Sequence, residues 1–482
     1  MPEQDEYEII IGLEIHAQLN TRTKLFCADS TNFGLEPNTQ TSVISLGHPG
    51  TLPKLNREAI TKAVRLGLAT ECTIIQHNYF ARKNYFYPDL PKGYQISQHT
   101  TPICRDGRFY VEANHSRKAI RINRIHMEED AGKSSHDNIG DDSFLDFNRA
   151  GMPLLEIVTE PDIRDASEAA AFVTGIRQLV RHLDVCDGNM EQGNLRCDVN
   201  ISVRLKGDQE LGTKVEIKNL NSIRFIKKAI EFEKQRLIDL HRSGAKILQE
   251  TRGFDEQSST TYSIRVKEDE DDYRYFPEPD LPPFYIRDEV IENIRNSMPP
   301  LHEEIKNILH EQYGLTSYDS EQLSSDMELY QLFLQLTEHT SQFKSAANWI
   351  IGPVRNYFSA NEIPPEEASI PLKSLAEIIR LTENGRISYN VAVQKVFPDL
   401  LKDPLLNIED HIAEKGWFIQ TSHVELDQWI NQSLETHAGK IADYRKGKKG
   451  LLSLFVGEVM KLSGGTADAQ LVTEKIKEKL KP

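Results

Sequence analysis

Four segments in the first half of the chain concentrate side chains that could bind a metal ion and phosphate. The densest is RIHMEEDAGK, residues 124–133, in which a histidine and three acids precede a glycine and a lysine. Oxygen and nitrogen ligands beside a cation suit a hard metal ion together with phosphate groups. A solvated turn is the alternative interpretation, because runs of ionisable residues are often exposed surface.

The other three segments alternate apolar and polar residues with the period of a β-strand. Side chains at positions i and i+2 share one face of a strand, so the polar residues of each segment point the same way. If one sheet collects these strands, its polar face carries Glu14, His16, Asp198, Glu216 and Lys218, with the acids of His126–Asp130 at its rim. This arrangement predicts a metal and phosphate site, although each pair could separately be a solvated face.

The composition is that of a globular protein with several domains. At 482 residues the chain is long enough for about three domains of roughly 150 residues each. Its hydrophobic content of 39% and charged content of 27% are typical of globular proteins. The sequence has no apolar run of about 18 residues to span a membrane, and its acidic N-terminus lacks a signal-peptide pattern. We therefore expect a cytoplasmic protein without a membrane partner.

Cysteine spacing and charge exclude two further classes of protein. The five cysteines are scattered and form no C-x-x-C pair, so we expect reduced thiols. The formal net charge of −16 argues against a protein coated in nucleic acid. Residues 407–482 carry 11 basic and 11 acidic residues, so the excess negative charge lies in residues 1–406. Any nucleic acid would have to bind a local basic patch.

Strands and helices alternate loosely up to about residue 285, which predicts a mixed α+β domain. The clearest strand is Arg196–Leu205, predicted to be antiparallel and half-buried, and Leu154–Val158 is predicted as another. Residues 27–53 are rich in turn-forming residues and predict a long functional loop. Amphipathic patterns predict helices at Asn56–Ala69, Asp165–Leu183 and Ile223–Leu240.

Beyond Ile286 the pattern is that of helices alone. An acidic run, Lys267–Asp272, is expected to be a solvated turn, and the proline cluster after it marks the end of a domain. Helices are then predicted at Glu289–Ser297, Leu301–Tyr313, Ser320–Thr340, Ala346–Phe358, Ile370–Glu383, Tyr389–Phe397 and Leu451–Leu462.

Two segments combine cations with features that favour nucleotide or RNA binding. The segment Ala81–Gln95 interleaves cations with aromatic residues, which can stack a base and hold phosphate or can pack an irregular loop. A basic patch, Arg445, Lys446, Lys448 and Lys449, precedes a predicted helix. It could receive a phosphate backbone, and a plain solvated loop is the alternative.

Seven blocks, in a fixed order within the first 285 residues, resemble the signature segments of one enzyme family. They are GLEIHAQL, RKNYFYPDLPKGYQIS, HMEEDAGKS, DFNRAGMPLLEIVTEPDI, QGNLRCDVNISVR, KVEIKNLNS and DDYRYFPEPDLPP. On these blocks the chain resembles the B subunits of tRNA-dependent amidotransferases, the GatB/GatE family. The resemblance implies an α+β, cradle-like domain with a mixed or antiparallel sheet at residues 1–290. An all-helical domain at 291–406 and a small helical, YqeY-like tail at 407–482 that contacts tRNA would follow.

The activity implied by this resemblance is that of an ATP-dependent carbon–nitrogen ligase. It converts misacylated Glu-tRNA(Gln), Asp-tRNA(Asn) or both into Gln-tRNA(Gln) and Asn-tRNA(Asn). A side-chain carboxylate is inert to ammonia because oxide is a poor leaving group, so ATP phosphorylates it first. We find no convincing glutaminase nucleophile in this sequence. The family takes ammonia from glutamine through its amidase partner, the A subunit, with a small third partner, the C subunit, bracing the pair.

Motif matches also imply which residues act. Glu14, His16, Glu129 and Asp198 resemble the family's metal ligands, which would hold Mg²⁺, and the imidazole suggests that Mn²⁺ could substitute. The strand period leaves the choice between Glu128 and Glu129 open, and the motif favours Glu129. His126, Glu128, Lys83 and Lys92 are further catalytic candidates. Candidate contacts to ATP or the aminoacyl end are Tyr85, Asn148, Arg149, Glu216 and Lys218.

One departure from the family concerns zinc. Many members carry a four-cysteine zinc site after the first strand. Here Cys27 remains, and Asp29, Ser42 and Ser45 stand where the other three cysteines would align. We therefore expect no structural zinc.

Two other functions remain open from the sequence. One is a tRNA-binding scaffold protein whose acidic cluster is merely structural. A weaker one is a stand-alone metal-dependent phosphohydrolase that needs no tRNA.

Overall fold

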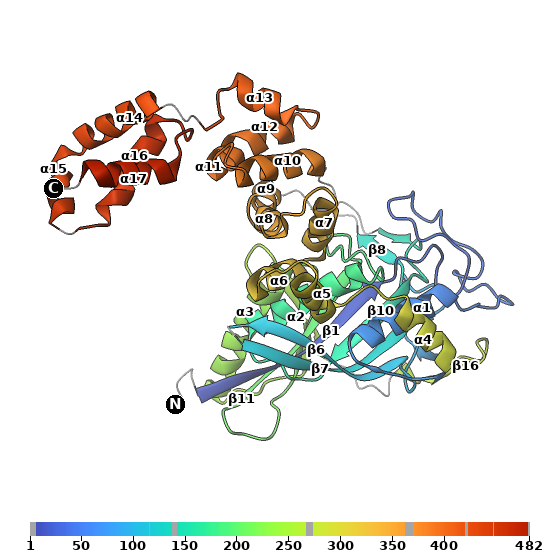
Figure 1. Cartoon of the computed structure of the whole chain (residues 1–482). Coiled ribbons are helices and arrows are strands. Elements are labelled where there is room, and N and C mark those ends of the chain that lie inside the picture. Colours follow the sequence, from blue (N-terminus) through green and yellow to red (C-terminus); the bar gives the residue numbers. More distant parts are fainter. Residues whose placement is uncertain are drawn as a thin grey trace. The chain divides into compact units, whose positions relative to one another are not determined.

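The computed structural model describes residues 6–114, 116–136, 142–266, 273–361, 370–419, 423–446 and 448–480. The chain divides into two compact units, Met1–Pro299 and Pro300–Pro482 (Figure 1). The predicted acidic turn Lys267–Asp272 lies outside the described residues. None of the helices within the described ranges has both the length and the apolar character needed to cross a bilayer.

The first unit is built on a 12-stranded mixed sheet. Its strands are β1 (Tyr7–Gln18), β2 (Thr73–Ile74), β4 (Ala81–Asn84), β5 (Tyr94–Ser97), β6 (Cys104–Ala113), β7 (Ser116–Glu129), β10 (Pro153–Thr159), β11 (Leu195–Leu205), β12 (Val215–Leu220), β13 (Glu250–Asp255), β14 (Thr260–Val266) and β15 (Phe276–Pro277). The order β14-β13-β12-β11-β1-β10-β7-β5-β4-β15 places β1 at the centre, and the β6–β2 pair branches from β7. Only the β12–β13 pairing of this sheet is parallel among the described strands.

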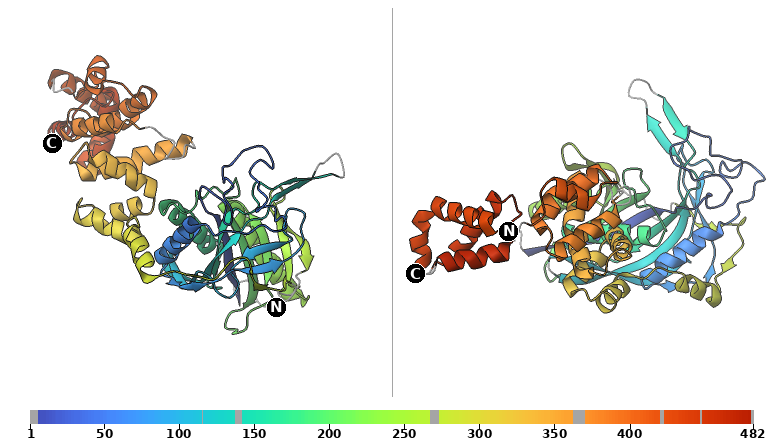
Figure 2. Two further views of the ribbon diagram at one scale, coloured as in Figure 1. Left: turned by 90° about the vertical axis from the view of Figure 1, so that its right-hand side faces the viewer. Right: turned by 45° about the horizontal axis from the view of Figure 1, so that its top comes forward.

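Two short strand pairs lie outside this sheet. They are β3 (His77–Asn78) with β16 (Phe284–Tyr285), and β8 (Lys133–His136) with β9 (Ser143–Asp146). The β8–β9 hairpin projects away from the sheet, as the right-hand view of Figure 2 shows.

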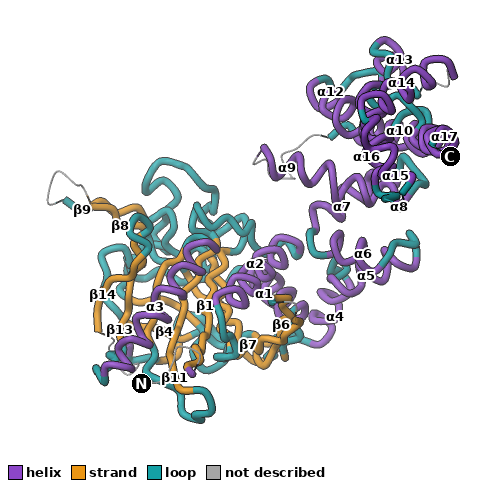
Figure 3. The backbone as a smooth tube through the Cα atoms, turned by 90° about the vertical axis from the view of Figure 1, so that its left-hand side faces the viewer, coloured by secondary structure: helices purple, strands orange, loops and turns teal. Residues whose placement is uncertain are grey.

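Three helices cover one face of the sheet (Figure 3). They are α1 (Arg57–Ala69), α2 (Ala166–His182) and α3 (Ile223–Ser243), and α4 (Asp288–Asn296) packs against α1. Two begin where the sequence supplies a cap. Asn56 accepts a hydrogen bond from the backbone of Glu58, and Asp165 accepts from the first turn of α2.

The alternation of side chains along β1 explains the layering. Its odd-numbered residues from Tyr7 to Ala17 are buried and apolar, whereas Glu14 and His16 are only partly buried. Successive side chains of a strand point to opposite faces, so the odd positions face the helices and the even positions form the opposite, polar face. The fold is therefore α+β, as predicted.

The neighbouring strand β11 differs in its burial from the half-buried strand that the sequence predicted. It is antiparallel to β1 as predicted. It is not half-buried, because Asp198 and Ser202 on its polar side are only 4% and 6% exposed. The reason is its position inside the sheet between β1 and β12, where the polar side chains pack against those of neighbouring strands.

The long loop at residues 27–53 contains no helix and no strand, as predicted, and it is held by buried polar contacts. Lys24 is fully buried, and its ammonium group donates to the carbonyl oxygens of Gln40 at 2.7 Å and Phe147 at 3.3 Å. The side chain of Asn38 donates to the carbonyl of Leu145 at 2.9 Å. These bonds fix the loop against the segment that follows β9.

The second unit is helical throughout its described secondary structure. It contains α5 (His302–Glu311), α6 (Ser317–Ser324), α7 (Met327–Thr337), α8 (Phe343–Trp349), the π-helical turn η3 (Ile350–Val354), α9 (Arg355–Asn361), α10 (Leu372–Glu383), α11 (Tyr389–Val391), the π-helical turn η5 (Ala392–Val396), α12 (Phe397–Lys402), α13 (Ile408–Glu414), α14 (His423–Thr436), α15 (Ala438–Arg445), α16 (Leu451–Leu462) and α17 (Ala469–Lys479). The predicted helix Ser320–Thr340 is wrong as one element. Asp326 caps α7 by accepting from the backbone of Glu328 and Leu329, and this cap separates α6 from α7.

Two hydrophobic cores lie within the second unit. The larger extends from Ile305 to Ile412 and includes the fully buried Trp349. The smaller extends from Leu426 to Leu480 around Phe455. Helix α13 begins just beyond residue 407, the predicted start of the tail, and it contributes Ile408 and Ile412 to the larger core.

Candidate functional site

The candidate site lies on the polar face of five adjacent strands, β12, β11, β1, β10 and β7. The antiparallel register places His16 opposite Glu156, and Glu14 opposite Asp198. Glu156 in turn lies opposite His126 on β7. Directly opposed residues of antiparallel strands point to the same face, so side chains far apart in sequence meet here. The structure thus forms the single sheet on which the predicted site depends.

The first cluster consists of His16, Glu128 and Glu156, whose potential ligand atoms all lie within 4.8 Å of one another. The Nε2 atom of His16 is 3.5 Å from a carboxylate oxygen of each glutamate. His126 joins them, with its Nε2 3.2 Å from Glu156. Within the described parts of the chain, its buried Nδ1 has no hydrogen-bond partner.

The electrostatics of this cluster are those of buried imidazoles among carboxylates. Burial alone would lower the pKa of His16, but the hydrogen bond and charge of Glu156 and the charge of Glu128 raise it to about 9. Burial likewise opposes the charged form of His126, and the same two glutamates raise its pKa to about 9. Both imidazoles therefore carry a proton near pH 7 and balance the charge of the two glutamates.

The second cluster consists of Glu14, Asp198 and Glu216, again with ligand atoms within 4.8 Å of one another. Lys218 bridges two of these acids, since its Nζ is 3.2 Å from Asp198 and 3.2 Å from Glu216. Burial would lower the pKa of Lys218, but the charges of Asp198 and Glu216 raise it above its ordinary value. The lysine therefore remains charged and compensates part of the acidic cluster.

Hydrogen bonds from neighbouring residues of the sheet hold these three acids in place. Asn200 donates to Glu14 at 2.8 Å, and the backbone N–H of Asn219 donates to Asp198 at 2.8 Å. The hydroxyl group of Thr251 donates to Glu216 at 2.9 Å. The carboxylates are thus fixed by the sheet itself.

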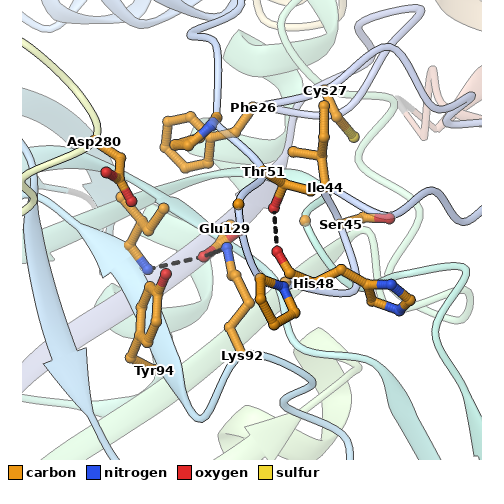
Figure 4. Close-up of a pocket in the computed structure, with 16 residues that line it drawn as sticks. Phe26, Cys27, Ile44, Ser45, His48, Thr51, Lys92, Tyr94, Glu129 and Asp280 are labelled. Atoms are coloured by element: carbon orange, nitrogen blue, oxygen red, sulfur yellow. Dashed lines mark hydrogen bonds and ion pairs between the residues drawn. The ribbon is translucent and has the colours of Figure 1, made fainter.

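Glu129 lies apart from both clusters. Its neighbour Glu128 points to the polar face, so the side chain of Glu129 points to the opposite side of β7. There it accepts hydrogen bonds from the backbone of Ile96 at 2.9 Å and from the ammonium group of Lys92. Figure 4 shows this pair in a pocket lined also by Phe26, His48 and Tyr94. The structure therefore does not bring Glu129 together with Glu14, His16 and Asp198, whereas it does bring Glu128 to His16.

The acidic segment as a whole differs from the expected rim. Its residues His126, Glu128 and Glu129 lie within β7 and are 6%, 4% and 3% exposed. The alternative of a solvated turn is therefore wrong as well. The physical reason is that β7 continues between β10 and β5 to its end, so both edges of this segment are paired within the sheet.

Lys83 and Tyr85 lie beside the first cluster. The ammonium group of Lys83 is 4.8 Å from the ring centroid of Tyr273 and 5.9 Å from that of Tyr85. Burial would lower the pKa of Lys83, but the charges of Tyr275, Glu128 and Glu156 raise it. Lys83 is thus a cation within electrostatic range of the His16 cluster.

Asn148 occupies a different position from the other candidates. Its carbonyl oxygen accepts from the backbone of Gln40 at 2.8 Å, and its amide donates to the carbonyl of Glu36 at 2.8 Å. These bonds secure the long loop. Arg149, the next residue, pairs with Asp130 near the polar face.

Two polar residues of this site escaped the sequence analysis. Glu156 completes the first cluster, and Arg196 forms an ion pair at 3.1 Å with Asp130, one of the acids predicted at the rim. Glu156 was hidden because it is the one acid within the apolar strand β10. The alternating pattern of β11 already placed Arg196 on the same face as Asp198, and that signal could have identified it.

The residues expected to align with the family's four-cysteine zinc site lie together and are hydrogen-bonded. The hydroxyl group of Ser45 donates to Asp29 at 2.6 Å, and the backbone of Ser42 donates to Ser45 at 2.9 Å. Burial, together with a hydrogen bond to Asp29, raises the pKa of Cys27 to about 11. The absence of structural zinc stays a prediction.

The four cations of the predicted RNA patch are exposed at the end of α15 and the start of α16. Lys448 pairs with Asp443 at 3.0 Å, and Arg445 donates to the carbonyl of Leu480 at 3.4 Å. Lys446 and Lys449 lie next to them.

Comparisons with known proteins match almost the whole chain. A family model described as the GatB/GatE catalytic domain matches residues 9–292, and one described as the GatB domain matches residues 331–480. The B subunit of an aspartyl/glutamyl-tRNA(Asn/Gln) amidotransferase from Thermodesulfovibrio yellowstonii is 46% identical over 471 residues, which cover 98% of each protein. Proteins of the same name from Geobacter sp. strain M21 and Chlorobium phaeobacteroides are 46% and 44% identical, over 98% of this chain and 99% of theirs.

Proposed function

Because the chain belongs to the GatB/GatE family, as B subunits of the aspartyl/glutamyl-tRNA amidotransferase do, we propose that it activates and amidates misacylated tRNA. The substrates are Glu-tRNA(Gln), Asp-tRNA(Asn) or both, and the products are Gln-tRNA(Gln) and Asn-tRNA(Asn). The observation that supports this proposal is the pair of acidic clusters on one polar face, with Lys83, Lys218 and Arg149 around them.

The chemistry requires two steps. An oxygen of the substrate's side-chain carboxylate attacks the γ-phosphorus of ATP, the bond to ADP breaks, and an acyl phosphate forms. Ammonia then attacks the acyl carbon, inorganic phosphate leaves, and the nitrogen loses a proton. Phosphoryl transfer depends mainly on positioning and on neutralising negative charge, which fixed cations achieve.

The two clusters fit divalent cations. Three carboxylates held together and only partly balanced by Lys218 form an oxygen donor set that suits Mg²⁺. His16, Glu128 and Glu156 add an imidazole, a donor that also suits Mn²⁺. A bound cation would neutralise charge on phosphate oxygens. Binding at the first cluster would require His16 to lose its proton.

The protein's own residues would hold the acidic ligands in position and balance negative charge at the site. Asn200, Asn219 and Thr251 hold the acids of the second cluster at fixed positions. Lys83 and Lys218 supply positive charge on the side of the reacting phosphate. Lys92 and Glu129 form the pocket pair on the other side of β7. Ammonia for the amidation would come from the amidase partner, the A subunit, braced by the small C subunit.

The decisive experiment measures ATP cleavage by the chain in complex with its amidase and small-protein partners. Glu-tRNA(Gln), Asp-tRNA(Asn) and uncharged tRNA are supplied separately, with and without glutamine. We expect cleavage that only a misacylated tRNA stimulates, and amide formation when glutamine is present. Cleavage that ignores tRNA would instead indicate the phosphohydrolase.

One substitution distinguishes the proposed enzyme from the alternative, a tRNA-binding scaffold protein. Asp198→Asn keeps the shape of a residue in the second cluster and removes its charge. We expect at least about a 100-fold loss of phosphorylation with tRNA affinity retained, because a metal ligand would be lost. Near-normal turnover in a variant with unchanged Tm would show that the acidic cluster is structural.

A further inference from the structure

Asp130 is buried between two arginines beside the first cluster. Its carboxylate is bound by Arg149, from the loop before β10, and by Arg196, from β11. The Nη2 atom of Arg196 is 3.1 Å from each oxygen of Asp130. Asp130 itself is 7% exposed and accepts a further hydrogen bond from the backbone of Ala131 at 3.0 Å. One carboxylate therefore holds two guanidinium groups at the same place.

Through Arg196 this trio adjoins both acidic clusters on the polar face. The register places Arg196 directly opposite His16 of the first cluster. Asp198 of the second cluster is two residues further along β11, so its side chain shares the face of Arg196. The negative charges that act on Arg196 are those of Asp130, Glu128 and Asp198, which raise its pKa.

The arrangement contains more positive charge and more donors than Asp130 needs. Two guanidinium groups face one carboxylate, so the trio by itself carries one net positive charge. The ion pairs with Asp130 engage the Nη2 atom of each arginine, and within the described residues the buried Nε of each has no hydrogen-bond partner. The side chains of Arg149 and Arg196 are 30% and 23% exposed, so part of each remains accessible.

We propose that Arg149 and Arg196, fixed by Asp130, form a clamp for the phosphoryl group transferred from ATP to the aminoacyl carboxylate. The inference rests on the proposed function and adds Arg196 and Asp130 to its machinery. In the transfer, the carboxylate oxygen bonds to the γ-phosphorus while the bond to the β,γ-bridging oxygen breaks, and ADP leaves with that electron pair. No proton moves in this step.

The chemistry of arginine explains the arrangement. Negative charge spreads over the three equatorial oxygens of the phosphoryl group during transfer, and a planar guanidinium matches two such oxygens at once. Lysine offers the same charge without the planar fork. Asp130 is a positioning residue, because it contacts the guanidinium groups and not the phosphate.

The competing explanation is a purely structural ion pair that joins β7, the β10 loop and β11. Removal of either arginine would then lower Tm and leave turnover of the folded protein unchanged. The two explanations differ in which measured quantity changes.

The test uses the assembled amidotransferase with Arg196→Lys, Arg149→Lys and Asp130→Asn. We expect Arg196→Lys to lower kcat for ATP cleavage driven by misacylated tRNA by about 100-fold or more, with less than about a threefold change in KM for ATP. Arg149→Lys should behave in the same way. Asp130→Asn should lower kcat by about 10-fold with KM for ATP unchanged, which a structural role would not produce.

A binding measurement provides a second readout. Aluminium fluoride bound with ADP mimics the phosphoryl group in transfer, so wild type with misacylated tRNA should bind ADP at least about 10-fold more tightly when fluoroaluminate is present. Arg196→Lys should lose this gain while its affinity for ADP alone is preserved. If Arg196→Lys fails to fold, the same two measurements on Arg149→Lys decide between the clamp and a structural ion pair.

Arg121→Lys is the matched control. Arg121 lies on the same sheet and binds Asp162 through two hydrogen bonds of 2.9 and 2.7 Å, but it is exposed. The substitution Arg121→Lys should leave unchanged both kcat and the increase in ADP affinity that fluoroaluminate produces. Wild-type values for a folded clamp variant would overturn the clamp alone, whereas a wild-type complex that ignores misacylated tRNA would overturn the proposed function as well.

Discussion

At the scale of single residues, the neighbours Glu128 and Glu129 allow a direct test of the first cluster. Glu128 lies 3.5 Å from His16, whereas Glu129 binds Lys92 and the backbone of Ile96. Glu128→Gln should therefore weaken Mn²⁺ binding by at least about 10-fold, because a carboxylate ligand is lost. Glu129→Gln should leave Mn²⁺ affinity nearly unchanged. Titration of the free chain followed by electron paramagnetic resonance measures both, and equal losses would contradict the assignment.

The sequence alone could predict only part of this difference between Glu128 and Glu129. The two-residue period of strands shows that adjacent glutamates point to opposite faces, and it does not show which face is the polar one. The motif resemblance favours Glu129 as the metal ligand. The register of β7 against β10 places Glu156 opposite His126, and this long-range pairing brings Glu128 to His16. No local pattern contains that information, because the pairing joins segments from different parts of the chain.

A second residue-scale prediction concerns pH. Burial, together with the hydrogen bond and charge of Asp29, raises the pKa of Cys27 to about 11. The raised pKa keeps the thiol protonated, so at pH 8 only about one molecule in a thousand carries the reactive thiolate. Alkylation of Cys27 by iodoacetamide should be about 100-fold slower than that of glutathione at pH 8. It should accelerate about 10-fold per pH unit up to pH 10. Mass spectrometry of the modified peptide gives the rate, and a rate like that of glutathione would contradict the prediction.

At the scale of elements, the buried Lys24 should determine whether the long loop at residues 27–53 stays in place. Its ammonium group binds the carbonyls of Gln40, within the loop, and Phe147, in the segment that follows β9. Lys24→Met should lower the free energy of unfolding by about 1 to 3 kcal/mol, because buried carbonyl groups lose a donor. It should also expose the loop to proteases.

Lys54→Met serves as the control, because Lys54 lies just beyond the same loop and is exposed. Urea titration and timed proteolysis compare the two variants. If they unfold at the same urea concentration and are cleaved at the same rate, the buried lysine does not hold the loop.

Elements with a strong local signal could be predicted well. The strand β11 and the helices α2 and α16 lie within about two residues of their predicted ends, because hydrophobic period and capping residues are local features. The long hairpin of β6 and β7 was not predicted, since charged residues alternate along its exposed edge and resemble surface loop. The division between α6 and α7 was missed because one capping aspartate outweighs an otherwise continuous helical pattern.

At the scale of the whole molecule, charge and architecture separate two tasks. The residues that we propose to bind ATP and metal lie in the first unit, on a sheet whose other face is packed against helices. The tail has a small core of its own around Phe455 and carries no net charge over residues 407–482. An acidic protein that binds tRNA needs such a local surface, because its overall field repels phosphate.

The last prediction concerns how the tail would meet that need. Lys446 and Lys449 are exposed, whereas Arg445 and Lys448 already have partners within the tail. The double variant Lys446→Glu and Lys449→Glu should therefore weaken tRNA binding without disturbing the core. Each lost phosphate contact reduces the slope of log Kd against log salt by about 0.7 to 0.9, so the slope should fall by about 1.5.

The control reverses the same number of charges at Lys461 and Lys477, two other exposed lysines of the tail. If net charge alone governed tRNA affinity, the two double variants would have equal Kd values and equal salt slopes. A smaller slope confined to the Lys446 and Lys449 variant would show that contact with phosphate is local. It would also show that a net charge of −16 is compatible with RNA binding, since counterion release depends on contacted phosphates and not on the charge of the whole protein.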